Sequence, residues 1–190
     1  MTRTTNWLWL LFLIFFLAAC RPKQMDRQHL NQYVRDEGNG LRKRDSSTNG
    51  IKIDVMMIRP ELLFDGSKNM KKISDSLRYF MISFNKNDRE ALLQAGDQST
   101  YSTLVENLSL AVTKYCRLIV DKKDTIQINN YSFSNGYGTA PANNLLLIFK
   151  APTPQKEYDL ELDELGLNIG TRKYTFKEED ITNLDNIKIN

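Results

Sequence analysis

The chain has 190 residues, of which 41% are hydrophobic, and its 26 Lys/Arg and 23 Asp/Glu residues leave a net charge of +3. This length suits signals or linkers plus one ordinary domain, and it excludes a large multidomain enzyme. Two cysteines and one histidine are too few for a zinc site built from Cys and His.

The first feature along the chain is a run of eleven apolar residues from Trp7 to Leu17. As a helix this run would be about 16 Å long, whereas a bilayer core is about 30 Å thick and needs roughly 20 apolar residues. Arg3 and the amino terminus place positive charge in front of the run, and small residues follow it. The pattern therefore predicts a secretory signal rather than a membrane span.

The end of this signal, Leu17-Ala18-Ala19-Cys20, resembles the lipobox of bacterial lipoproteins. The resemblance implies that residues 1–19 are removed and that Cys20 carries acyl chains such as palmitate, which give stable membrane anchoring. Arg21 stands where an aspartate would retain such a protein in the inner membrane. We therefore expect a lipid anchor in the outer membrane facing the periplasm, with the cell surface as the alternative.

Residues 20–50 have few apolar positions and several turn residues, which predicts a flexible tether with a reach of about 30 Å, in which residues 30–38 could form a brief helix. From residue 21 to 50 there are seven Lys/Arg against four Asp/Glu, whereas residues 51–190 have eighteen against nineteen. The basic character thus lies next to the membrane. The near-neutral remainder argues against a nucleic-acid partner.

Residues 51–190 are predicted to form a single globular domain. Strands are expected at 51–58 and 76–84, where apolar side chains alternate or run continuously. Asn87 and Glu90 resemble a capping box at the start of a short helix, and Thr103 resembles another before a helix with an apolar stripe.

Further strands are expected in the second half of the domain. Residues 116–120 and 125–133 read as a hairpin, and 145–149 as a central strand because the run is apolar throughout. Apolar and acidic residues alternate over 158–163, as in a half-buried strand, and a further short strand is expected at 170–176. The tail after it could add an edge strand through Ile187 and Ile189. About seven strands and two short helices predict a mainly β fold: an antiparallel β-sandwich-like or α+β domain.

Two groups of residues are candidates for chemistry or binding. Between the hairpin and the central strand, a loop with two glycines and a proline carries or adjoins Tyr131, Phe133 and Tyr137, which predicts a partner-contact loop. The alternative is that these rings close over the end of the core. The acids Asp159, Glu161, Asp163 and Glu164 could be a Ca²⁺ or glycosidase-like site, but their alternation is explained by a solvated sheet face.

The remaining cysteine and histidine do not suggest catalysis. Cys116 lies in an apolar stretch and is expected to be a small buried hydrophobe. His29 falls in the predicted tether, so no catalytic triad, metal site or cofactor site is predicted in the domain. Asp75-Ser76-Leu77 and Asp124-Thr125-Ile126 resemble the O-glycosylation motif of Bacteroidetes.

These features favour a non-enzymatic structural or assembly subunit of an envelope machine, with another envelope protein as its partner. The size, lipobox and β-rich domain resemble, in architecture alone, the outer-membrane lipoproteins of secretion systems such as the type VI lipoprotein. The alternative function is a lipoprotein that binds a glycan, peptide or small molecule. A third hypothesis, a hydrolase that uses only carboxylates, needs two acids in a cleft.

Overall fold

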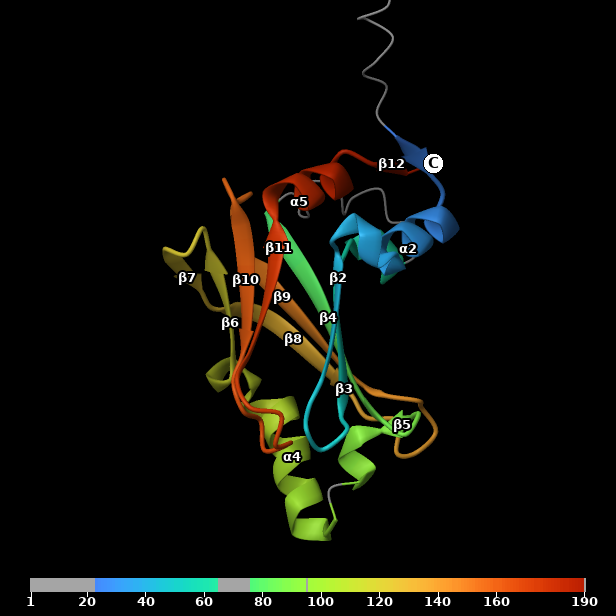
Figure 1. Cartoon of the computed structure of the whole chain (residues 1–190), viewed down its shortest axis with the longest axis vertical. Coiled ribbons are helices and arrows are strands. Elements are labelled where there is room, and N and C mark those ends of the chain that lie inside the picture. Colours follow the sequence, from blue (N-terminus) through green and yellow to red (C-terminus); the bar gives the residue numbers. More distant parts are fainter. Residues whose placement is uncertain (1–22, 65–75, 95, 190) are drawn as a thin grey trace, which may run out of the picture.

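The computed structural model describes residues 23–64, 76–94 and 96–189. Two antiparallel sheets pack face to face, with helices at both ends of the pair (Figure 1). The predicted mainly β, sandwich-like class is therefore confirmed. Residues 1–22, which include the signal and Cys20, lie outside the described residues, so the lipobox stays a prediction. None of the helices in the described ranges is long and apolar enough to cross a membrane.

The larger sheet is antiparallel throughout and ends in an edge strand on each side. Its strands, in their order across the sheet, are β2 (Arg42–Ser46), β3 (Lys52–Ile58), β4 (Leu77–Lys86), β9 (Asn143–Lys150) and β8 (Ile128–Ser134). The short strand β5 (Arg89–Glu90) folds back on the end of β4. The predicted apolar strand at 145–149 is β9, and it does lie inside the sheet.

The smaller sheet covers the inner face of the larger one. Its antiparallel strands, in order, are β11 (Arg172–Lys177), β10 (Glu157–Leu162), β6 (Cys116–Val120) and β7 (Asp124–Ile126). The predicted hairpin after residue 116 is β6–β7, but the chain then crosses to the larger sheet as β8. The structure describes twelve strands. Four of them have only two or three residues, and β2 lies before residue 51. The remaining seven correspond to the seven strands that the sequence predicts.

The core lies between the sheets because side chains alternate between the two faces of each strand. On β9, Leu145, Leu147 and Phe149 are fully buried, whereas Leu146 and Ile148 on the other face are only half-buried. Phe80 on β4 sits at the centre of the core. Its ring centroid is 5.8 Å from that of Phe149, 5.3 Å from that of Phe176 and 6.5 Å from that of Tyr158.

The structure corrects the predicted start of the domain. Residues 24–50 were predicted as part of a flexible tether, but they contain β1 (Gln24–Met25), α2 (Arg27–Arg35), a 3₁₀ turn at Glu37–Asn39 and β2. Leu30, Val34 and Leu41 are buried in the common core, and β1 pairs with β12 (Lys188–Ile189) at the carboxyl end. Because three apolar residues of this segment are buried despite its polar composition, residues 24–50 belong to the folded domain.

Both predicted helix starts also need correction. Asn87 and Asp88 have φ values of 52° and 57°, so they form a two-residue hairpin turn between β4 and β5, and residues 91–94 form a 3₁₀ helix. Helix α4 (Gln98–Leu110) begins earlier than Thr103, because Asp97 accepts a hydrogen bond from the Thr100 amide at 2.8 Å. The expected stripe holds at its centre, with Leu104, Leu108 and Val112 buried.

The carboxyl-terminal segment closes one end of the sandwich. Helix α5 (Glu178–Asp185) buries Ile181 and Leu184, and Ile187 is buried just beyond it. Figure 1 shows α5, α2, β1 and β12 at one end of the molecule and α4 with β5 at the other. The two chain segments nearest the termini therefore meet at the end opposite α4.

Candidate functional site

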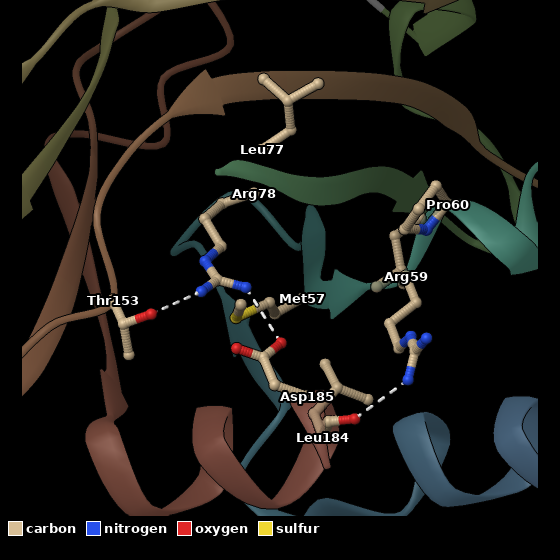
Figure 2. A pocket seen from close by; sticks show the side chains of 9 residues that line it. Met57, Arg59, Pro60, Leu77, Arg78, Thr153, Leu184 and Asp185 are labelled. Atoms are coloured by element: carbon tan, nitrogen blue, oxygen red, sulfur yellow. Dashed lines mark hydrogen bonds and ion pairs between the residues drawn. The ribbon is translucent and has the colours of Figure 1, made fainter. Parts of the chain in front are cut away.

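A cavity of about 250 Å³ opens at the end of the sandwich closed by α5. Its walls come from the end of β3, the 3₁₀ turn at Pro60–Leu62, the start of β4, the segment after β9 and the end of α5 (Figure 2). Apolar side chains share the wall with two arginines, Arg59 and Arg78. A guanidinium at a cavity wall can hold a carboxylate or phosphate, so the partners of these two groups decide what the cavity can bind.

Arg78 is buried on the inner face of β4, with 5% of its surface exposed. Its guanidinium donates to Asp185 Oδ1 at 2.9 Å, to Thr153 Oγ1 at 3.1 Å and to the Tyr158 hydroxyl at 3.1 Å. Burial alone lowers the pKa of Arg78, but Tyr158 and Asp185 raise it by more, and the pKa of Arg78 ends above its ordinary value. Arg78 is therefore a fixed cation that joins β4, β10 and α5.

Arg59 lies on the other side of the cavity and is paired just as fully. Its guanidinium binds both carboxylate oxygens of Glu61, and it donates to the carbonyl oxygens of Ile187 at 2.6 Å and Leu184 at 3.3 Å. These carbonyls lie at the end of α5, where a cation is favourable. Each arginine thus has an acidic partner, and the cavity carries no excess charge for an anion.

A second candidate is the loop that follows β8, which the sequence predicted as a contact loop. Tyr137 stands at its tip with 79% of its surface exposed and a φ of 50°. The Glu90 carboxylate is fully buried beneath the loop, where it accepts hydrogen bonds from the amides of Gly136 and, at 2.7 Å, Gly138. A Cβ at Gly136 would lie 2.4 Å from Glu90 Oε1, so only glycine fits there.

The surroundings of Tyr137 add apolar surface. Leu93 is 46% exposed and lies beside Gly138, and a shallow hollow of about 270 Å³ runs from Leu93 to Tyr101 on α4. Asn135 donates to the Tyr101 hydroxyl at 2.6 Å, which ties the start of the loop to α4. We call Tyr137, Leu93 and Tyr101 the Tyr137 surface.

The other two predicted contact residues lie elsewhere. Tyr131 and Phe133 stand on β8 opposite Leu147 and Leu145, so they face the space between the sheets and are half-buried. The structure therefore does not bring the three aromatic residues together. The link to Glu90 was missed because its position, 46 residues before Gly136, carries no local sequence signal.

The acidic residues near 160 form ion pairs with the neighbouring strands. Asp159 is fully buried and pairs with Lys173 Nζ at 2.7 Å, while Arg117 pairs with Glu161 at 2.6 Å and Asp163 at 2.8 Å. The prediction of a solvated face is therefore wrong: Asp159 is buried, Glu161 and Asp163 are half-buried, and these acids alternate with basic side chains of the neighbouring strands. Glu164 instead accepts hydrogen bonds from three amides of the loop after β10. Within the described ranges, no three Asp, Glu, His or Cys side chains gather as a metal site.

Cys116 is buried at the start of β6, and burial raises the pKa of its thiol to about 12. Only about one folded molecule in 10,000 would carry the reactive thiolate at pH 8. We expect iodoacetamide to leave Cys116 unlabelled in the native full-length chain at pH 8 and to label it after unfolding in guanidinium, where its pKa returns toward 9.0. Peptide mass spectrometry separates Cys116 from Cys20, and equal labelling in both states would contradict the buried environment.

Comparisons with known proteins add little to this geometry. No protein-family model and no curated protein matches the chain. Among solved structures, the chain is similar to a novel protein of unknown function from Burkholderia pseudomallei. The two are 8% identical with a TM-score of 0.40, over 89% of this chain and 98% of that one. A likeness at this level supports no conclusion about function.

Proposed function

We propose that the protein is a non-enzymatic lipoprotein that is anchored through Cys20 in the outer membrane and docks, from the periplasm, on another protein of an envelope assembly such as a secretion system. The Tyr137 surface carries the proposal. A tyrosine on a loop whose backbone is already ordered loses less entropy on binding, and tyrosine is enriched among residues that dominate interface energies. Glu90 supplies that rigidity from below the loop.

The position of the Tyr137 surface agrees with this role. Four peptide steps separate Cys20 from Gln24 in β1, which span at most about 14 Å. A lipid on Cys20 would therefore hold the β1–β12 end of the domain close to the membrane, much closer than the tether of residues 20–50 would have done. The loop contacts β5, at the opposite end of the molecule beside α4 (Figure 1). The Tyr137 surface would then project into the periplasm.

The residues available for chemistry support a non-enzymatic role. His29 is exposed on α2, and its Nδ1 contacts the Asp26 carboxylate at 2.9 Å as part of the helix start. Cys116 is a buried thiol, and the arginines of the cavity are held by acidic partners. None of these groups forms the nucleophile and adjacent general base that acyl transfer would need.

We expect a photoreactive phenylalanine analogue at position 137 of the full-length chain to give one discrete cross-linked product in cells. Leu110 is the matched control because it is an exposed apolar residue on α4, with 74% of its surface exposed, outside the Tyr137 surface. A Tyr137→Ala variant should lower recovery of the same partner at least about tenfold, or about 1.4 kcal/mol, without lowering the melting temperature. Equal products from positions 137 and 110 would refute the docking role.

A ligand-binding lipoprotein is the second candidate, and the cavity beside Arg78 favours it. Its volume of about 250 Å³ lies just below the usual range for small-molecule sites, and its wall mixes apolar and polar groups. This role predicts that native mass spectrometry of the purified full-length chain shows a bound small molecule. A chain that carries its own mass alone would remove this candidate.

A further inference from the structure

Strand β8 forms one edge of the larger sheet and, among the strands described, pairs only with β9. It is seven residues long, and its Asn129, Asn130, Ser132 and Ser134 side chains are exposed. The outward N–H and C=O groups of an edge strand can pair with another strand, so proteins normally protect such edges. The two larger sheets have three other edges, formed by β2, β11 and β7.

The other described edges carry the usual protection. Strand β2 contains Arg42, Lys43, Arg44 and Asp45, and β11 contains Arg172, Lys173 and Lys177. Strand β7 is only three residues long and begins with Asp124. Strand β8 has neither a charged residue nor a proline, and among the described edges it alone combines this composition with full strand length. Its single irregularity, a bulge between Ile128 and Asn130, leaves residues 130–134 regular.

The inner side of β8 is also incompletely covered. Tyr131 and Phe133 face the space between the sheets, yet both remain half-buried. The edge of the smaller sheet on this side is the short strand β7, which ends at Ile126, itself half-buried. An additional strand beside β8 would extend the larger sheet and place side chains next to these rings.

We infer that β8 pairs antiparallel with β8 of a second copy of the chain, so that the larger sheets of the two copies become continuous across a two-fold axis. In such a pair the residue at the two-fold axis meets its own copy, and residues before the axis meet those after it on the other strand. Like charges directly opposite each other are unfavourable, so the charged strands β2 and β11 are less suited to self-pairing than the uncharged β8. Serine and asparagine can hydrogen-bond to their copies, and Tyr131 and Phe133 bring aromatic contacts.

This pairing does not involve the Tyr137 surface, whose three residues lie outside β8, and it requires no lipid. If Cys20 is acylated, confinement to one membrane would raise the effective concentration of the copies and favour the dimer. The test therefore uses a cross-linker that works in any compartment. The measured quantity is the amount of a cross-linked product with twice the mass of the chain.

The experiment places single cysteines at the exposed positions Asn130, Ser132 and Ser134 of the full-length chain and treats intact cells with a short bis-maleimide. Residues opposite each other in an antiparallel pair have Cβ atoms about 5 Å apart, and the separation grows away from the two-fold axis. We expect a dimer band that is strong at one or two of these positions. The parent chain reports any reaction of Cys20, and Ser46→Cys, an exposed serine on the charged edge β2, is the matched control.

A second set of variants tests whether the strand edge itself is responsible. In the background of the cysteine position that gives the strongest dimer band, lysines at the other two positions should lower the cross-linked fraction about tenfold by placing like charges in the pair, whereas Ser46→Lys should not. All three positions are exposed, and an unchanged circular-dichroism melting curve verifies folding. A dimer that resists the lysines, equal cross-linking from Ser46→Cys, or a product with a different protein would overturn the inference. Cross-linking through position 137 should persist in the lysine variant, which separates this test from that of the docking role.

Discussion

Replacing Arg78 by methionine is expected to lower the free energy of unfolding by about 3 kcal/mol, near the lower end of the range for breaking a buried ion pair. The change leaves Asp185, Thr153 and the Tyr158 hydroxyl without the donor that joins them. Asp185 softens the loss, because its side chain is 35% exposed and water can take over part of its hydrogen bonding. Methionine fills most of the space, so the loss reports the polar contacts.

Urea unfolding of the full-length chain measures this prediction, and two further variants assign the loss. Arg78→Lys keeps the charge but not the three-way geometry of the guanidinium, so it should fall between the parent and Arg78→Met. Asp185→Asn should cost less than Arg78→Met, because Thr153 and Tyr158 keep their contact with the arginine. The double variant should lose less than the sum of the two single losses. A loss below about 1 kcal/mol for Arg78→Met would show that the pairing adds only what an exposed salt bridge does.

Arg78 also shows which features of the fold can be predicted from the sequence. The period of two along residues 76–84 places Arg78 on the same face of the strand as Phe80, Ile82 and Phe84, and the structure buries all four side chains. Its partners could not be predicted. Thr153, Tyr158 and Asp185 lie 75 to 107 residues further along the chain, and only the tertiary fold brings them to one point.

The prediction for the amino-terminal segment was wrong because it relied on composition. Polar and turn residues dominate positions 24–50, and composition alone predicted a tether. Leu30, Val34 and Leu41 nevertheless reach the core, and the Asp26 cap starts α2. A short polar helix is stabilised mainly by tertiary packing, which a local pattern does not record. The strands were predicted well because alternation is strong where one face of a sheet is buried.

In the candidate site, too, local features were predicted from the sequence and long-range contacts were not. Tyr137 was found from composition, since glycine, proline and aromatic residues together indicate a structured loop. Tyr131 and Phe133 were grouped with it by sequence proximity, but they belong to a strand whose side chains face the other sheet. Glu90 was interpreted as part of a helix start, whereas the positive φ values of Asn87 and Asp88 turn the chain and bury its carboxylate.

Replacing Glu90 by alanine is expected to lower the free energy of unfolding by about 3 kcal/mol, because the amides of Gly136 and Gly138 lose a charged acceptor and the buried side chain leaves a cavity. Glu90→Gln keeps one acceptor oxygen but turns an NH₂ group toward the second amide, so it should lose less than alanine. Glu106→Ala on α4 is the control for removal of an exposed acid and should change the melting temperature little.

The more specific consequence of Glu90→Gln lies in the loop that it supports. Gly136 and Gly138 would each lose part of their attachment, so Tyr137 would become mobile while the sheets keep their packing. Recovery of the partner should then fall several-fold, because a mobile loop must be ordered when the partner binds. Tyr137→Ala should abolish most of the same binding without loss of stability, and the double variant should be no weaker than Tyr137→Ala alone. If Glu90→Gln left binding unchanged while lowering stability, the buried carboxylate would serve the fold only, and the rigidity of the loop would have no part in docking.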